Sequence, residues 1–209
     1  MNTLSHIDLG SVIHEYLKNN QKIFLNKTSF IYGNVKPDLL PQLFIVPHLK
    51  ESLFNFIKEE LAHLSDICIE NTEKIDAAYS ERLGVVCHYI SDFFCRVHNP
   101  EEKINLLNHV QYEMKLSKYI KNRRQIIEKI NFSLSTPKFH TLHELIMRIE
   151  SMNEEYLKSS KIMGMDALYS TQICIELIIA VTNFSVINAN KYLEVSEHAN
   201  SLLYGHLLS

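Results

Sequence analysis

One segment of this chain is apolar on most sides and still carries a carboxylate, and that combination constrains the fold more than any other feature. We predict a helix over about residues 75–97, which contains Asp92 among valines, isoleucines and phenylalanines and stops before Asn99-Pro100, because proline cannot continue a hydrogen-bonded helix. A helix of this composition packs into a core on most of its faces. Burying a carboxylate there is costly unless a partner offsets the loss of hydration. We therefore expect Asp92 to face a cation.

Potential metal ligands recur at helical spacing around this carboxylate. His88 and Asp92 are four residues apart, His109 and Glu113 are also four apart, and His98 lies between the two pairs. Residues at this spacing project from one helical face with their Cβ atoms about 5–6 Å apart. One such pair is usually a surface hydrogen bond or a weak ion pair. Two pairs together indicate a metal centre, and nitrogen and carboxylate donors suit zinc in hydrolytic sites.

The composition favours an all-α, single-domain multi-helix bundle over residues 1–209. Glycine and proline number only 5 each, which suits long uninterrupted helices better than turn-rich sheets. A chain of 209 residues needs no second domain to bury a substantial core. The net charge of −3, from 21 basic and 24 acidic residues, gives no strong signal for nucleic acid or for an anionic membrane.

Hydrophobic periodicity and helix-boundary signals divide the chain further. Pro37 and Pro41 favour a loop-like turn that holds Asp38 beside a rigid backbone. Thr136 is the expected N-cap of a later helix, with Pro137 at its first position. Glu60 falls on an apolar helical face, and the sequence offers no account of it. The expected helices cover about residues 7–17, 48–65, 75–97, 101–130 and 138–160, with more helix towards the C-terminus.

The first residues and the longest apolar run indicate whether the protein is secreted or spans a membrane. The first residues show no positive stretch followed by an apolar one, so we expect no signal peptide and a cytoplasmic protein. The run from Ile173 to Val181 contains Glu176 and is too short to span a bilayer. We therefore predict a core helix there and no transmembrane segment.

The four cysteines show no C-x-x-C spacing, and we expect them to be reduced, buried thiols. They are Cys68, Cys87, Cys95 and Cys174. Cys87 and Cys95 lie close to the candidate ligands, but they are eight residues apart, which places them roughly 80° apart around a helix axis. This angle favours packing over metal binding.

Three further candidates, each near a helix start or in a stiff turn, complete a recognisable order of ligands. They are His6, Asp38 and His48. In chain order the full series resembles the ligand order of the zinc-dependent phospholipase C family, whose general plan the related single-strand-specific zinc nucleases share. The closest stretch is residues 83–113, where H-x-x-x-D, then H, then H-x-x-x-E matches the family's signature. The eight candidate ligands are His6, Asp38, His48, His88, Asp92, His98, His109 and Glu113.

The resemblance implies a mostly α-helical domain with two or three zinc ions. It implies one site from Asp38, His48, His88 and Asp92, a second from His98, His109 and Glu113, and a third that shares Asp92 and takes His6. In family enzymes the third ion is completed by the amino group and carbonyl of an N-terminal tryptophan. This chain contains no tryptophan, and Met1 lies five residues before His6, so three outcomes stay open for the third site: incomplete, altered or filled differently.

A cluster of this kind is suited to phosphodiester hydrolysis, because divalent ions lower the pKa of bound water and neutralise charge that develops on phosphorus. Asp38 is the expected catalytic residue, orienting or deprotonating the attacking water. The expected substrate is a small phosphodiester or a phospholipid headgroup. Two alternatives stay open: a non-catalytic, metal-stabilised helical protein, and a nuclease or nucleotidase whose basic residues between 115 and 129 hold phosphates.

Overall fold

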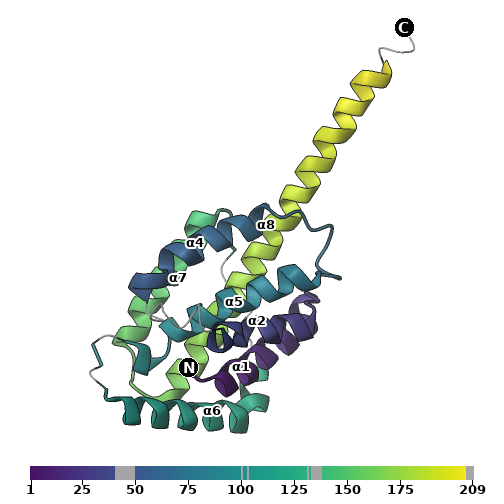
Figure 1. Ribbon diagram of the computed structural model, residues 1–209. Coiled ribbons are helices and arrows are strands. Elements are labelled where there is room, and N and C mark those ends of the chain that lie inside the picture. Colours follow the sequence, from purple (N-terminus) through teal and green to yellow (C-terminus); the bar gives the residue numbers. More distant parts are fainter. Residues whose placement is uncertain (41–49, 100, 103, 131, 133–137, 206–209) are drawn as a thin grey trace.

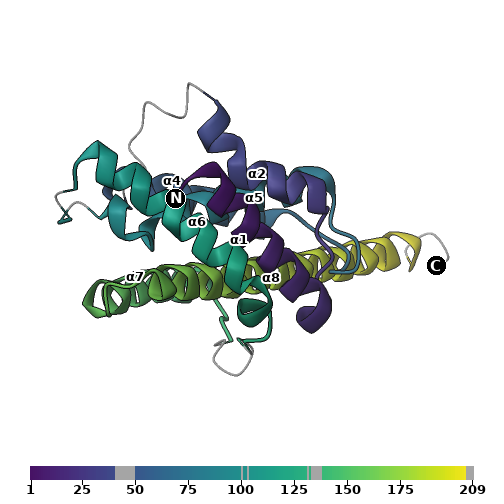
Figure 2. The same ribbon diagram turned by 90° about the horizontal axis from the view of Figure 1, so that it is seen from below.

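Every regular element of the described chain is a helix, and the computed structural model (Figures 1 and 2) describes residues 1–40, 50–99, 101–102, 104–130, 132 and 138–205. The all-α class is therefore confirmed, with no strand among these residues. The elements are α1 Thr3–Tyr16, the π-helical turn η1 Leu17–Gln21, α2 Lys27–Leu39, α4 Lys50–Asp66, α5 Ala77–Phe93, the 3-10 turn η2 Arg96–His98, α6 Leu106–Glu128, α7 Leu142–Lys158 and α8 Met163–Gly205.

Five of these helices begin at a polar residue whose side chain accepts a hydrogen bond from a backbone N–H in the first turn. Such a cap satisfies one of the amide groups that have no partner inside the helix. It also fixes where each helix begins, and so where its side chains project. The caps are Asn2 on α1, Asn26 on α2, Asp76 on α5, Asn105 on α6 and Thr141 on α7.

Helix α5 lies at the centre of the bundle and is buried over most of its length. It packs most closely against α2 and also contacts α4 and α8. It stops at Phe93, four residues earlier than predicted, because its last carbonyls find partners elsewhere in the fold. Asn153 of α7 donates to the Phe93 carbonyl at 3.0 Å, and Ser170 of α8 donates to the Ser91 carbonyl at 3.2 Å. The predicted helix 75–97 is thus α5 followed by η2, which carries His98.

The loop expected around Pro37 is wrong, because residues 27–39 form helix α2. A proline removes one helical hydrogen bond, the one to the carbonyl four residues earlier. Pro37 lies in the last turn of α2, so only that bond is lost, and Phe30, Gly33 and Asn34 remain buried against the rest of the bundle. Packing therefore outweighs the local signal, and Asp38 stands on a helix end instead of in a turn.

Two other helices begin later in the sequence than predicted. Helix α6 begins at Leu106 behind the cap Asn105, five residues after the expected start. Helix α7 begins at Leu142, and its cap is Thr141, which accepts from the Glu144 N–H at 3.2 Å. The expected cap Thr136 and the adjoining Pro137 lie outside the described residues. The other predicted helices correspond to α1 and α4 within a few residues.

Helix α8 is 43 residues long, passes through the bundle and extends well beyond it (Figure 1). The predicted apolar run is only part of it. Over Met163–Leu193 this helix is long and apolar enough to cross a membrane by length and composition alone, and 67% of its most apolar window is buried against the other helices. That burial is typical of a core helix, which is what the sequence predicts for this run.

Two carboxylates on apolar faces of the helices are each paired with an arginine. Glu60, which the sequence left unexplained, receives two hydrogen bonds from Arg82 of α5, at 2.5 and 2.9 Å. Glu176, inside the apolar stretch of α8, receives two from Arg148 of α7, at 2.9 and 3.3 Å. The paired geometry offsets the cost of removing these carboxylates from water.

Candidate metal centre

Seven of the eight candidate ligands are described, and the fold brings all seven to one end of α5 although they come from five elements. Helix α1 supplies His6 and α2 supplies Asp38. His48 lies outside the described residues. The remaining five are His88 and Asp92 on α5, His98 on η2, and His109 and Glu113 on α6.

The first group consists of His6, Asp38 and His88, whose candidate ligand atoms all lie within 4.8 Å of one another. His88 Nε2 is 3.7 Å from Asp38 Oδ1, and the two imidazole rings are stacked with centroids 3.9 Å apart. Both histidines are fully buried, whereas the Asp38 side chain is 16% exposed. Asp38 is therefore the donor of this group that solvent reaches.

The second group consists of His98, His109 and Glu113, again with candidate ligand atoms within 4.8 Å of one another. Glu113 Oε1 is 3.1 Å from His98 Nε2 and 3.2 Å from His109 Nε2. Burial raises the pKa of the Glu113 carboxyl, but the hydrogen bond from His98 and the nearby positive charges outweigh it and lower the pKa to about 2. Glu113 is thus held as a carboxylate.

Asp92 lies between the two groups and is fully buried. Its Oδ2 atom is 3.6 Å from His88 Nε2 in the first group. Its Oδ1 atom is 3.4 Å from His6 Nε2 and 3.7 Å from His98 Nε2, so this single oxygen reaches both groups. A carboxylate in this position is suited to bridging two ions, since each oxygen offers lone pairs to a metal.

The amino group of Met1 lies among the same donors. It hydrogen-bonds to Asp92, is 2.8 Å from His98 Nε2, and is 3.4 Å from Glu113 Oε1. Burial lowers the pKa of this amino group, but the charges of Asp92 and Glu113 raise it more, and its pKa is raised to about 11. Asp92 therefore faces a positive charge in this structure. The resemblance implied an N-terminal amino group at the third site, but that of a tryptophan, so the sequence left open whether Met1 takes this place.

Groups behind the ligands fix their orientation. His88 Nδ1 is 2.8 Å from the Asn34 carbonyl, which only accepts, so Nδ1 carries the proton and Nε2 keeps a lone pair towards Asp38 and Asp92. Thr3 donates to Asp38 Oδ2 at 2.9 Å. Ser91 Oγ lies 3.3 Å from His6 Nδ1. None of these supporting residues was singled out from the sequence.

One unsatisfied atom tests whether the site fits a metal ion. His6 Nε2 is buried and makes no hydrogen bond, although it lies 3.4 Å from Asp92 Oδ1. A buried nitrogen without a hydrogen-bond partner is costly unless something else uses its lone pair. A zinc ion does so, and imidazole with carboxylate is a set that zinc prefers. The residues present therefore fit the ion, and neither donor group found among the described residues includes a cysteine.

The cysteines are mostly core residues. Cys87, Cys95 and Cys174 are buried and free, as predicted, whereas Cys68 is exposed, so its predicted burial is wrong. Burial raises the pKa of the Cys87 and Cys95 thiols. Both thiols are therefore held in the protonated form, which is neither a metal ligand nor a nucleophile.

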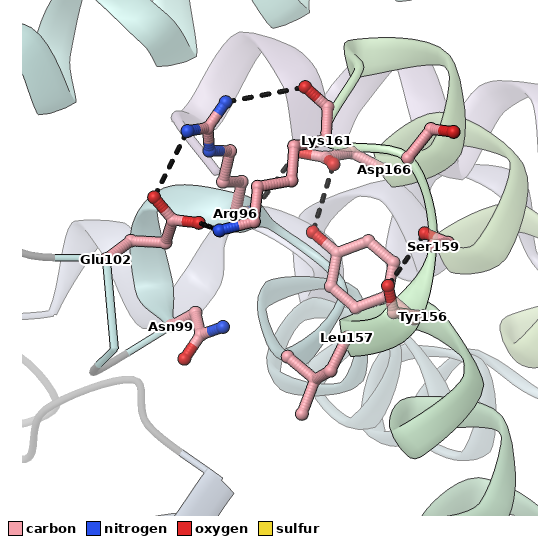
Figure 3. Close-up of a pocket in the computed structure, with 9 residues that line it drawn as sticks. Arg96, Asn99, Glu102, Tyr156, Leu157, Ser159, Lys161 and Asp166 are labelled. Carbon is pink, nitrogen blue, oxygen red and sulfur yellow. Dashed lines mark hydrogen bonds and ion pairs between the residues drawn. The ribbon is translucent and has the colours of Figure 1, made fainter.

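Asp166 of α8 connects the two elements that carry the second group. Its Oδ2 accepts from the Arg96 backbone N–H at 3.1 Å and from the Tyr112 hydroxyl at 2.9 Å. Its Oδ1 accepts from the Tyr156 hydroxyl at 3.0 Å (Figure 3). Arg96 begins η2, which ends at His98, and Tyr112 directly precedes Glu113. Burial raises the pKa of Asp166, and these hydrogen bonds partly offset that effect.

Asp166 also lines a small pocket with Arg96, Glu102 and Lys161 (Figure 3). Arg96 Nη2 is 3.1 Å from Glu102 Oε2, and Lys161 pairs with the other oxygen of the same carboxylate. Glu102 pairs with both cations and Asp166 adds a second acidic group, so the pocket presents little free positive charge to an anionic ligand. Its residues support η2, and the metal donors lie elsewhere.

Comparison with known protein families gives a match to the zinc dependent phospholipase C family over residues 5–163. The chain belongs to this family. The matched region contains all eight predicted ligands and ends at the first residue of α8. The resemblance inferred from the ligand order is thus confirmed, and the family consists of zinc-dependent enzymes. No curated protein and no solved structure matches the chain.

Proposed function

We propose that this protein is a zinc-dependent phosphoric ester hydrolase of the phospholipase C type. In this proposal a metal-activated water attacks a phosphodiester, which is a phospholipid headgroup or a small soluble relative of one. Family membership supports zinc dependence and a phospholipid substrate. The arrangement of the donors supports the chemistry.

The observation that carries the proposal is the position of Asp92 between two groups of three donors. Its two oxygens lie within 3.7 Å of nitrogens from both groups, so ions held by the groups would share this carboxylate. When bound, neighbouring zinc ions supply a water with a pKa near neutrality and stabilise the negative charge of the transition state.

The protein's own residues divide the remaining work. Asp38 and His109 are the most accessible donors of their groups, with side chains 16% and 29% exposed. In this proposal they form the open edge of the centre, and a phosphodiester reaches the centre past them. Asp38 is the proposed catalytic residue. Thr3 holds its Oδ2 in place, and Asp38 is therefore positioned to orient a water and accept its proton.

The experiment combines elemental analysis with an assay on a soluble substrate. Untreated protein is expected to contain zinc and to hydrolyse para-nitrophenyl phosphocholine, and both properties are expected to fall sharply in Asp92→Asn. Asp66→Asn is the matched control, because Asp66 is an exposed aspartate outside the centre. Zinc without hydrolysis of any phosphodiester would favour the metal-stabilised, non-catalytic alternative. Fully folded protein without zinc would contradict the proposal.

A further inference from the structure

Helix α6 exposes a stripe of large apolar side chains that no described residue covers. Leu106 is 80% exposed, Leu107 66%, Val110 45% and Met114 63%. Leu106, Val110 and Met114 are spaced by four residues and so share one face of the helix. Helix α6 itself lies along the lower edge of the molecule in Figure 1 and on the side seen in Figure 2. An exposed apolar stripe on an outer helix is typical of an interaction surface.

The stripe borders the open edge of the metal centre. His109 directly precedes Val110, and Glu113 directly precedes Met114. Val110 and Glu113 are three residues apart, which separates them by only about 60° around the helix axis. A surface that covers the stripe would therefore lie beside His109, the most accessible donor of the second group.

Basic residues continue the same surface along α6. Lys115, Lys118 and Lys121 are exposed, and Lys118 and Lys121 follow Met114 by four and seven residues. Lys115 and Lys118 form no ion pair with a described residue. Asp8 of α1 faces Lys121 and Arg124, and Glu128 pairs with Arg124 at 2.8 Å, so these acids neutralise only part of the basic charge.

We propose that the stripe and the lysines that follow it dock the protein on an anionic phospholipid bilayer, with the centre open towards the lipid headgroups. The proposal rests on the proposed function in that a phospholipid is the substrate. Apolar side chains beside lysines are the pattern of helices that lie in a membrane interface. A nucleic-acid backbone would leave the four apolar side chains without a partner. A two-fold contact with a second copy would bring the lysines of both copies into one interface.

Vesicle co-sedimentation of the full chain as purified, without added zinc or chelator, tests the apolar half of the surface. The probes are vesicles of phosphatidylcholine alone and of phosphatidylcholine with phosphatidylserine, pelleted quickly at low temperature to limit hydrolysis. The double variant Leu106→Ser with Met114→Gln is expected to bind both at least about tenfold more weakly, because two large side chains no longer leave water. Met147→Gln on α7, where Met147 is also 50% exposed, is the matched control and is expected to bind as the unaltered protein does.

The basic half is tested by Lys115→Gln with Lys118→Gln. This variant is expected to lose roughly fivefold in affinity for each lysine on the phosphatidylserine vesicles, and little on phosphatidylcholine alone, because each lysine near an anionic surface contributes about 1 kcal/mol. Lys74→Gln is the control, since Lys74 is exposed in the segment between α4 and α5. All substituted side chains are exposed, and circular dichroism would verify the fold of each variant.

Zinc content and hydrolysis of the soluble substrate, measured on the same samples, separate the two proposals. Vesicle binding that depends on the stripe, in protein without zinc or hydrolysis, would overturn the proposed function and support the docking surface. Normal zinc and hydrolysis with no vesicle binding, or with binding unchanged in both double variants, would overturn the docking surface. It would also be overturned if the lysines were needed for single-stranded DNA and not for vesicles, or if Met114→Gln dissociated a dimer.

Discussion

Gly33 on α2 and Gly84 on α5 face each other where the two helices cross, and neither position has room for a methyl group. A Cβ atom on Gly33 would lie 2.0 Å from the Glu81 backbone oxygen, and one on Gly84 would lie 2.3 Å from the Phe30 backbone oxygen. Helix α2 carries Asp38, whereas α5 carries two further donors. The closeness of this crossing therefore sets the distance between donors of the first group.

We expect Gly84→Ala to weaken both the fold and the first donor group. The added methyl group meets backbone atoms, so the helices must separate, and overpacking of this kind costs at least about 1–3 kcal/mol. Gly164→Ala is the control, because its Cβ would meet only the end of the Tyr119 side chain, at 2.8 Å. Denaturant unfolding and zinc titration of both variants are the measurements. Equal losses of stability and of zinc affinity in the two variants would show that the helix crossing does not position the site.

Tyr112 and Tyr156 offer a second matched pair, since both donate to Asp166 but only Tyr112 stands on a helix that carries metal donors. We expect Tyr112→Phe to lower zinc affinity at the second group while sparing the first. Tyr156→Phe is expected to lower stability by about 1 kcal/mol with zinc affinity unchanged. Stepwise zinc titration followed by thermal unfolding distinguishes these effects. If Tyr112→Phe left zinc affinity unchanged, the hydrogen bond from Tyr112 to Asp166 would act on stability alone.

The sequence predicted the all-helical class and placed both candidate ligand pairs on helices, because periodicity and spacing are local properties. Asp38 was selected because Pro37 and Pro41 predicted a turn. The structure has a helix there instead, because α2 packs against α5. Asp166 was missed because its partners lie far away in the sequence, on η2, α6 and α7. The place of the Met1 amino group stayed open because it depends only on the path of the chain. Tertiary contacts decide all three positions.

The cysteines should differ sharply in reactivity. Cys68 is exposed, whereas Cys87 and Cys95 are buried and burial raises the pKa of both thiols. Alkylation by iodoacetamide under native conditions, followed by mass spectrometry, is therefore expected to modify Cys68 and to leave the other three thiols largely unmodified. Denatured protein, in which all four cysteines react, is the control. Fast modification of Cys95 in the native state would contradict the burial of η2 against the bundle.

The pH dependence of stability should report on Glu113 in protein freed of metal by a chelator. Its pKa is lowered from an ordinary 4.5 to about 2 in the folded state. A carboxyl with a lowered pKa stabilises the fold above its ordinary pKa, and this contribution disappears as the pH falls through the folded value. The unfolding free-energy difference between the unaltered protein and Glu113→Gln is therefore expected to be fully present at pH 4.5 and to shrink towards pH 2. Glu154→Gln, at an exposed position, serves as the control. A difference that stayed constant over this range would mean that His98 and the Met1 amino group do not stabilise the Glu113 carboxylate.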